Sequence, residues 1–528
     1  MLKNKFHLYG DELTQLPAHL QYGKHMFQRI KAQKNKLAFI NAETGETLSY
    51  EELTQKVVDI ALSLTRMGIK KGDVVGVCSE KNLDFIATKL AIACAGATIC
   101  PTDVSSGRAN IIHRLKLANP KLMFCSAYGY DTHKESFSEI PGLNQFIVYG
   151  DKAREGATLF KDFLTEHAAV EDFQPVPVTA EDPVCILYSS GTTGLPKGIP
   201  LTNKSFLMWM ESIINRNIFN DKKVLTTREW YYSYGLSFTL SCIAAGSTIV
   251  YCPSGDTPSF LDAIQACKVN VIQLAPATLT EMVNSPLIDQ RDLNSTELIV
   301  SASTLCHGEL IIAAKSKFPN LRKVCQLYGM SEVGGLASDQ NAPKGIKYGS
   351  VGVVGPGLEV KVVDLETRVP LGPKQRGELC VKNIAYTPKY LTVTGSPTNH
   401  IDDDGFFITG DIVYYDEDGY IFWVDRIKEL IKFDSYQVAP AELEAVLQQH
   451  PAVREAGVAG APHPKYGEAP TALVVLKQGA TISAEELVKY VDGQVSHRMR
   501  LAGGVRFVKQ LPRNSADKLD RKALKLLL

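Results

Sequence analysis

The sequence has no excess of either charge, and this absence argues against polyanionic partners. Its 528 residues include 57 lysines and arginines and 57 aspartates and glutamates, so the formal net charge is zero. A chain without net charge has no overall field to steer it onto nucleic acid or an anionic membrane surface. We therefore expect no nucleic-acid partner.

Paired cysteines, metal-binding histidine patterns and long apolar runs are missing as well. The eleven cysteines contain no C-x-x-C pair, and the eleven histidines are not at metal-ligand spacing, which is typical of reduced thiols inside a cell. The most apolar stretch, at 90–101, is too short to span a bilayer, and the N-terminus lacks a signal-peptide apolar region. The last three residues are leucines, not a Ser-Lys-Leu peroxisomal signal. We expect a cytoplasmic protein without a membrane span, and no obligate protein partner is evident.

What the sequence does contain is a regular alternation of strand-like and helix-like segments. Short aliphatic runs such as VVGVC, LMFCS and VCILYSS alternate with amphipathic stretches such as 50–68, which predicts an α/β fold of several layers. The DEDG sequence at 416–419 predicts a tight hairpin turn between aromatic-rich strands. Beyond it, Pro440 begins a predicted helix, followed by strand and helix signals typical of a separate small unit. We expect a large N-terminal domain at 1–424 and a small α+β C-terminal domain at 425–528.

The stretch YSSGTTGLPKGIP, from Tyr188 to Pro200, is the first candidate binding site. Glycines that let backbone amides approach a ligand, together with several hydroxyl groups and Lys197, suit the oxygens of a phosphate chain. The loop does not match the Walker A pattern, because Pro196 and Gly198 flank the lysine. On pattern alone, an ordinary surface loop remains an alternative.

Further motifs occur in a fixed order along the chain: YGMSE at 328–332, RGEL from Arg376, TGD at 409–411, VDRIKELIK at 424–432, YQVAPAELEAVL from Tyr436, and DKLDR around Lys518. With the loop at 188–200, this ordered set resembles the adenylate-forming enzymes, a family that includes acyl-CoA ligases, coumarate-CoA ligase-like enzymes and beetle luciferases. The resemblance covers nearly the whole chain.

The resemblance implies adenylation of a carboxylic acid by ATP and Mg²⁺ with release of pyrophosphate, followed by transfer to CoA. Glu332 is the implied Mg²⁺ ligand, and Asp425 the hinge about which the small, mobile domain rotates between two catalytic poses. Lys518 and Ser331 are implied near the α-phosphate, Lys432 in the second pose, and Tyr232 near the acid. The implied nucleotide-binding residues are Ser189, Ser190, Gly191, Thr192, Thr193, Gly194, Lys197, Tyr328, Asp411 and Arg426. The implied lining of the acid pocket is Arg216, Tyr232, Tyr234, Ser301, Ala302, Gly335 and Leu336.

Several residues depart from the family pattern. Asp517 stands just before Lys518, where the family usually has glycine, and Ser435 stands where CoA ligases generally have glycine. Tyr232 replaces a histidine found in many members, and a phenol with a pKa near 10 is a poor base at neutral pH. Ala302 and Leu336 are larger than the residues usual there, which predicts a pocket shaped differently from that of beetle luciferases.

Three functions therefore remain open at this stage. The first is acid–CoA ligation, and the second is a luciferase-type monooxygenase that uses O₂ and a luciferin unlike the beetle one. The third is a sensor that binds adenylates without catalysis.

Overall fold

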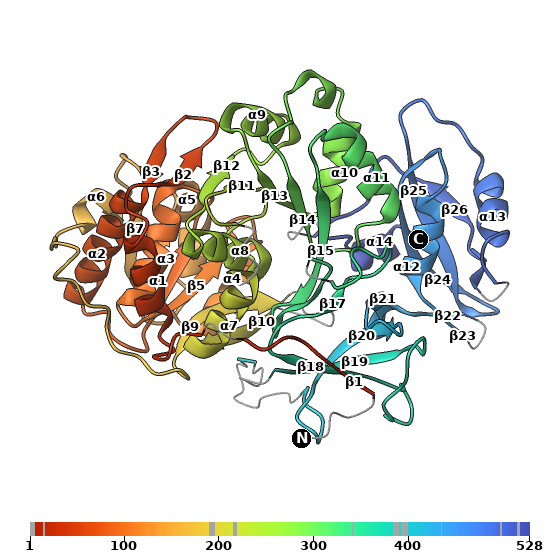
Figure 1. Ribbon diagram of the computed structural model, residues 1–528, viewed down its shortest axis with the longest axis horizontal. Helices are drawn as coiled ribbons and strands as arrows, with labels where there is room; N and C mark the ends of the chain where they lie inside the picture. Colours follow the sequence, from red (N-terminus) through yellow and green to blue (C-terminus); the bar gives the residue numbers. More distant parts are fainter. Residues whose placement is uncertain are drawn as a thin grey trace.

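The structure, a computed structural model, describes residues 6–13, 16–189, 196–214, 219–340, 342–383, 390–391, 400–433, 436–496, 499–514 and 518–528. It has a large N-terminal domain with three sheets and a small C-terminal domain with a fourth (Figure 1). None of the helices in these ranges is both long and apolar enough to cross a bilayer. The predicted mixed α/β architecture of a large and a small domain is confirmed.

The first large sheet has seven strands and is parallel except at one edge, where β9 and β10 pair antiparallel. Its strand order is β10 (Lys197–Thr202), β9 (Pro183–Ser189), β5 (Thr98–Thr102), β4 (Val74–Cys78), β6 (Leu122–Cys125), β7 (Gln145–Val148) and β8 (Thr158–Leu159). Helices α4 (Arg108–Ala118), α5 (Ala127–Phe137) and α6 (Phe160–Phe163) follow its strands along the chain. The phosphate-loop motif therefore joins β9 to β10 at the edge of this sheet.

The second large sheet has nine strands, and its central strands from β2 to β15 are parallel. Its order is β17 (Val353–Val354), β16 (Gly334–Ser338), β15 (Lys323–Met330), β14 (Leu298–Ser301), β13 (Val271–Leu274), β11 (Lys223–Thr226), β12 (Thr248–Tyr251), β2 (Leu37–Asn41) and β3 (Thr47–Ser49). Helices α9 (Thr257–Cys267), α10 (Pro276–Asn284) and α11 (Gly308–Lys317), with the short turn η1 (Ile288–Gln290), belong to its connections.

Five helices share one hydrophobic core with strands of both large sheets. They are α1 (Tyr22–Lys31), α2 (Tyr50–Arg66), α3 (Leu83–Cys94), α7 (Asn203–Ile214) and α8 (Ser233–Ala244). The α3 sequence LDFIATKLAIAC is buried on nearly every side, and its one buried cation, Lys89, donates to the Trp230 carbonyl at 2.6 Å. The two large sheets are therefore joined through one shared core.

A third, antiparallel sheet of five strands completes the large domain. Its order is β1 (His7–Tyr9), β18 (Leu358–Val363), β19 (Gly377–Asn383), β20 (Phe407–Tyr415) and β21 (Ile421–Arg426). The predicted hairpin turn lies between β20 and β21, where Asp416 accepts the backbone N–H groups of Asp418 and Tyr420 at 3.0 Å each. Gly419 takes the positive φ of 79° that closes the turn.

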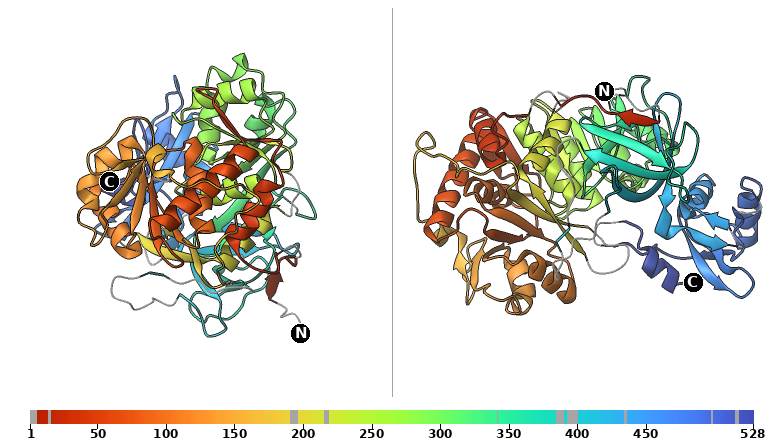
Figure 2. Two further views of the ribbon diagram at one scale, coloured as in Figure 1. Left: turned by 90° about the vertical axis from the view of Figure 1, so that its left-hand side faces the viewer. Right: turned by 90° about the horizontal axis from the view of Figure 1, so that it is seen from below.

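The C-terminal domain follows β21 and the short turn η2 (Ile427–Glu429), and it lies at one end of the molecule (Figure 2). Its strands are β22 (Ile431–Phe433), β23 (Tyr436–Val438), β24 (Val453–His463), β25 (Gly467–Leu476) and β26 (Val505–Phe507), and its helices are α12 (Pro440–Gln448), α13 (Ala484–Asp492) and α14 (Arg521–Leu526). Leu443 and Leu447 of α12 are fully buried in a core of its own. The helix predicted to begin at Pro440 is confirmed.

Candidate functional site

The main cavity lies where the nine-stranded sheet, the antiparallel sheet and the C-terminal domain meet. Its volume is about 1940 Å³, and its walls include residues of β15, β20, β21, α8 and α12 and the chain around Lys518. Pockets for a single small ligand usually measure about 300–1,000 Å³. The cavity can therefore hold a nucleotide and a second molecule together.

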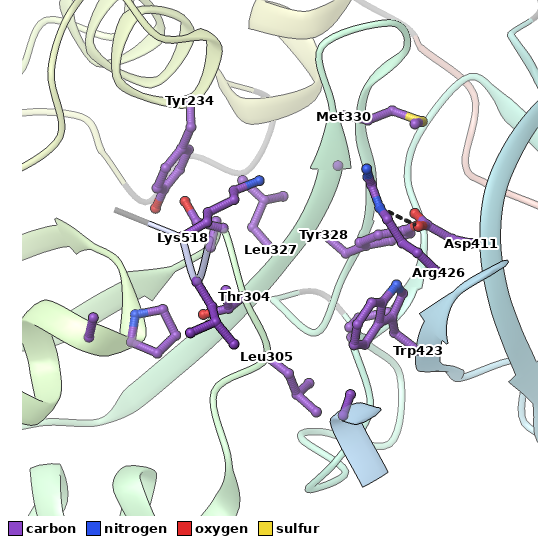
Figure 3. Close-up of a pocket in the computed structure, with 18 of the residues that line it drawn as sticks. Tyr234, Thr304, Leu305, Leu327, Tyr328, Met330, Asp411, Trp423, Arg426 and Lys518 are labelled. Carbon is purple, nitrogen blue, oxygen red and sulfur yellow. Dashed lines mark hydrogen bonds and ion pairs between the residues drawn. The ribbon is translucent and has the colours of Figure 1, made fainter. Parts of the chain in front are cut away.

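Asp411 and Arg426 form an ion pair on one wall of this cavity (Figure 3). The Arg426 Nε donates to Asp411 Oδ1 at 2.9 Å, and the Tyr328 hydroxyl donates to Asp411 Oδ2 at 2.5 Å. Asp411 is 1% exposed, so both hydrogen bonds are needed to offset the loss of hydration of its charge. The Asp411 carboxylate raises the pKa of Arg426, while burial and then Asp411 raise the pKa of Tyr328.

The local sequence explains why these two charges meet. Asp411 on β20 is the direct cross-strand partner of Arg426 on β21, and a β-bulge between Ile412 and Val413 shifts the register of the hairpin by the one residue that brings them opposite each other. Facing side chains of an antiparallel pair lie close enough for direct contact. Trp423, also on β21, contributes an aromatic ring to the same wall (Figure 3).

Lys518 extends into the cavity from the C-terminal domain (Figure 3). Burial and the neighbouring Arg426 guanidinium lower the pKa of Lys518 to about 8, against the opposing attraction of Asp411. Its backbone is fixed by Asn514, whose N–H donates to the Lys518 carbonyl at 2.8 Å and whose Oδ1 accepts the Lys518 N–H at 3.0 Å. The structure thus brings Lys518 together with residues that lie far from it in the sequence.

A second polar group surrounds Glu332. The carboxylate is 6% exposed and accepts a hydrogen bond from the Tyr390 hydroxyl at 2.8 Å. The Lys197 ammonium lies 4.6 Å from the centre of the Tyr390 ring and 3.4 Å from His400 Nε2. Because burial and Lys197 lower the pKa of His400, its ring is neutral at pH 7 and can accept from the lysine.

Tyr232 lies on the cavity wall, but its hydroxyl is directed at another residue. It donates to Asp103 Oδ2 at 2.9 Å. Burial on its own would raise the pKa of Asp103, but hydrogen bonds from Ser105, Tyr232 and Ser106 outweigh it and lower the pKa. Asp103 is therefore a carboxylate that orients the phenol at neutral pH.

Ser331 and Tyr234 are also held by neighbours. The Ser331 hydroxyl donates to the Ser233 hydroxyl at 3.0 Å, and the Tyr234 hydroxyl donates to the Val300 carbonyl at 3.0 Å. Both residues line the cavity.

Two of the residues expected to line the acid pocket, Ser301 and Leu336, do not line the cavity. Ala302 and Gly335 lie on the cavity wall, whereas Ser301 is 0% exposed and Leu336 is 1% exposed within a hydrophobic core. Leu336 is the extra residue of a β-bulge in β16, between the pairs Tyr328–Ala337 and Gly329–Gly335, and its side chain packs into that core. The added volume of Leu336 is therefore taken up by the core and does not narrow the cavity.

Lys432 and Asp425 lie in different surroundings. Lys432 is exposed on β22 and lies outside the cavity wall, while Asp425 is 1% exposed at the end of β21. Asp425 accepts the backbone N–H of Ala441 at 2.9 Å, so it caps the first turn of α12. Burial raises the pKa of Asp425 to about 6, although Arg521 opposes the rise.

Some predicted positions lie outside the described residues: Ser190, Gly191, Thr192, Thr193, Gly194, Arg216, Ser435 and Asp517. Ser189, the first residue of the phosphate-loop set, ends β9.

The sequence reasoning missed several residues of the site. Tyr390, His400, Arg228, Trp423 and Asp103 surround the predicted residues or line the cavity. None belongs to a motif, because each is a single residue brought in by tertiary packing. Trp423 is the one of these residues that the sequence could have indicated. A surface hairpin does not require a tryptophan, and this one stands two residues before the predicted hinge Asp425.

Two family models match the chain. The model described as AMP-binding enzyme matches residues 26–391, and the model described as AMP-binding enzyme C-terminal domain matches residues 442–518.

Similar proteins include enzymes of two kinds. Luciferin 4-monooxygenase of Luciola mingrelica is 34% identical over 524 residues, covering 97% of this chain and 94% of the relative. A 4-coumarate–CoA ligase of Petroselinum crispum is 33% identical over 520 residues, with the same shares of 97% and 94%. Among solved structures, ATP-bound MatB from Rhodopseudomonas palustris is 26% identical with a TM-score of 0.84, covering 96% of this chain and 98% of that one.

The buried Asp425 carboxyl predicts a pH-dependent stability. Between about pH 4 and pH 6 the unfolded chain ionises this group while the folded protein keeps it protonated, so the free energy of unfolding decreases as the pH rises. We expect Asp425→Asn to remove a decrease on the order of 1–3 kcal/mol. Urea unfolding of both proteins at pH 4.0 to 7.0, in steps of about half a unit, measures the difference. Asp403→Asn, at an exposed position, is the control; a wild-type-minus-variant difference that is constant with pH would contradict the prediction.

Proposed function

The chain belongs to the AMP-binding, adenylate-forming enzymes, and we propose that it activates a carboxylic acid with ATP and then transfers the acyl group to CoA. The observation that carries the proposal is the meeting of Lys518 with the Asp411–Arg426 pair and Glu332 around one cavity. Cations and hydrogen-bond donors placed where negative charge develops are the main requirement for joining two anions.

The wall around Asp411 suits the adenosine part of the nucleotide. A carboxylate has about four lone-pair positions, and Arg426 and Tyr328 use two of them. The remaining positions can accept the two ribose hydroxyl groups. The raised pKa of Tyr328 keeps its hydroxyl protonated, and the uncharged ring offers a flat surface for the adenine.

The cations suit the phosphates and the reacting centre. A carboxylate oxygen of the acid attacks the α-phosphorus of ATP, the bond from that phosphorus to the bridging oxygen breaks, and pyrophosphate leaves with the electron pair. Lys518 offsets the charge on the α-phosphate oxygens, with Ser331 nearby, while Lys197 and the hydroxyl-rich loop hold the β- and γ-phosphates. The lowered pKa of Lys518 leaves it mainly protonated at pH 7.

Glu332 fits a magnesium ion that is also bound to phosphate. Within the described ranges no group of three or more His, Cys, Asp or Glu side chains could hold a metal on its own. Mg²⁺ is usually bound through one or two carboxylates together with substrate phosphates, so the one buried carboxylate of Glu332, held by Tyr390, is sufficient. The metal would neutralise charge on the departing pyrophosphate.

The acid would occupy the part of the cavity near Tyr232, Tyr234, Ala302 and Gly335. Arg216 is proposed for the same pocket on the resemblance alone. Ser301 and Leu336 are not part of this proposal, because both are buried away from the cavity.

We further propose a domain division at Asp425, with 1–424 binding ATP and the acid and 425–528 rotating between two poses. The described pose has Lys518 in the cavity and Lys432 exposed, as adenylation would require. In the other pose the face carrying Lys432 and Tyr436 would reach the cavity. Asp425 suits a hinge because it joins the end of β21 to the first turn of α12.

The second step has two chemically distinct candidates. CoA thiolate attack on the acyl carbon would give a thioester and AMP, whereas O₂ would be the co-substrate of a luciferase-type reaction. Tyr232 favours the first, because its hydroxyl is bound to Asp103 and supplies no base at neutral pH.

The eleven unpaired cysteines suit a reducing compartment, and we propose the cytoplasm.

The direct test is pyrophosphate release with ATP and Mg²⁺ across a panel of fatty, aromatic and heteroaromatic acids, with and without CoA, while light is recorded. We expect release that requires one class of acid, requires Mg²⁺ and accelerates with CoA. Light emission without an effect of CoA would favour the oxidative second step. Nucleotide binding without pyrophosphate release for any acid would support a non-catalytic sensor instead.

Lys518→Ala tests the central cation. We expect adenylation to fall by about 10²–10³-fold, since a charge stabiliser at the reacting phosphate is lost, while thioester formation from supplied acyl-adenylate is retained. The wild-type adenylation rate should also decrease as the pH rises through about 8, where Lys518 loses its proton. Lys489→Ala, at an exposed position on α13, is the control. Equal losses in both half-reactions would show that Lys518 does not act on adenylation specifically.

A further inference from the structure

Helix α12 presents acidic residues to two separate parts of the molecule. Leu443 and Leu447 bury one face of the helix in the C-terminal core. Glu442 and Glu444 instead lie on the wall of the cavity. The position of α12 is therefore linked both to the C-terminal core and to the cavity wall.

Glu442 binds the large domain. The Arg376 guanidinium, directly before β19, donates to both carboxylate oxygens of Glu442 at 2.6 and 3.2 Å. A two-point contact of this kind fixes orientation as well as distance. It is an ion pair between a strand connection of the large domain and a helix of the small one.

Glu444 binds the segment that carries Lys518. Arg521 donates to the two oxygens of Glu444 at 2.7 and 3.0 Å and to the Val458 carbonyl at 2.9 Å. The Arg521 side chain is 17% exposed and that of Glu444 is 12% exposed, so this contact is largely protected from water. Arg521 follows Lys518 by only three residues, so the contact anchors the chain from which the catalytic ammonium extends.

We infer that Arg376 and Glu442 are positioning residues that favour the pose in which Lys518 occupies the cavity. The inference rests on the proposed function for its catalytic consequence. Rotation of the C-terminal domain would move Glu442 and leave Arg376 behind, so the pair belongs to one pose only. The Arg376 side chain is 56% exposed and that of Glu442 is 27% exposed, and such pairs shift an equilibrium modestly, by about 2–5-fold.

A charge-exchange series tests the inference. The variants are Arg376→Ala, Glu442→Ala, the double alanine variant, and Arg376→Glu/Glu442→Arg. The matched control is Lys374→Ala/Glu417→Ala, which removes a pair of 2.6 Å between exposed side chains that both belong to the large domain. Each protein is assayed for pyrophosphate release with the best acid of the panel, and for consumption of that acid's synthetic adenylate by CoA.

We expect each alanine variant to slow adenylation about 2–5-fold and to leave the second half-reaction unchanged or faster. The double alanine variant should be no slower than the single ones, because both remove the same contact. The exchanged pair should recover most of the rate, and the control should match the wild type. Additive losses in the double variant, or equal losses in both half-reactions, would overturn the inference.

A second measurement reads the pose without any acid. Fluorophores on Tyr128→Cys and Phe507→Cys, both exposed and one in each domain, report the domain arrangement by energy transfer in a Cys267→Ser background. We expect the alanine variants to change the transfer efficiency and the exchanged pair to restore it, whereas identical efficiencies in all variants would overturn the inference. If the wild type adenylates no acid, the proposed function fails, and this measurement alone decides whether the ion pair selects the pose.

Discussion

The ion pair between Asp411 and Arg426 is the contact on which the site depends. A carboxylate that is 1% exposed is costly to bury without compensation, and here a guanidinium and a phenol supply it. The pair lies at the open end of the β20–β21 hairpin. Asp425, the residue directly before Arg426, caps helix α12 of the small domain. The nucleotide wall and the proposed pivot are therefore built from the same two strands.

This arrangement couples binding to domain position. In the described pose the pairing of β20 with β21 holds Asp411 and Arg426 in the antiparallel sheet, next to the proposed pivot at Asp425. Lys518 belongs to the small domain and reaches the cavity only through the placement of α12 and the segment around Asn514. A binding wall in the antiparallel sheet and a cation supplied by the small domain are suited to an enzyme that performs two reactions in one cavity.

The sequence predicted the layered fold, the hairpin at 416–419 and the helix at Pro440, because these depend on local periodicity and turn residues. Its ordered motifs also brought Tyr328, Glu332, Asp411, Arg426 and Lys518 to one place. It could not predict that Leu336 packs into a core, since the β-bulge at this residue interrupts the regular alternation of β16. Partners such as Tyr390 and Asp103 depend on tertiary packing between distant strands, which no local pattern records.

The central claim is that a carboxylate oxygen of the acid attacks the α-phosphorus of ATP within this cavity. The most direct measurement uses the acid with ¹⁸O at both carboxylate oxygens, followed by mass spectrometry of the AMP formed in a complete turnover. The account predicts one ¹⁸O atom in each AMP, because the oxygen that joins acid and phosphorus stays with phosphorus when the acyl group leaves. AMP without label would mean that water, and not the acid, attacks ATP, and would contradict the account.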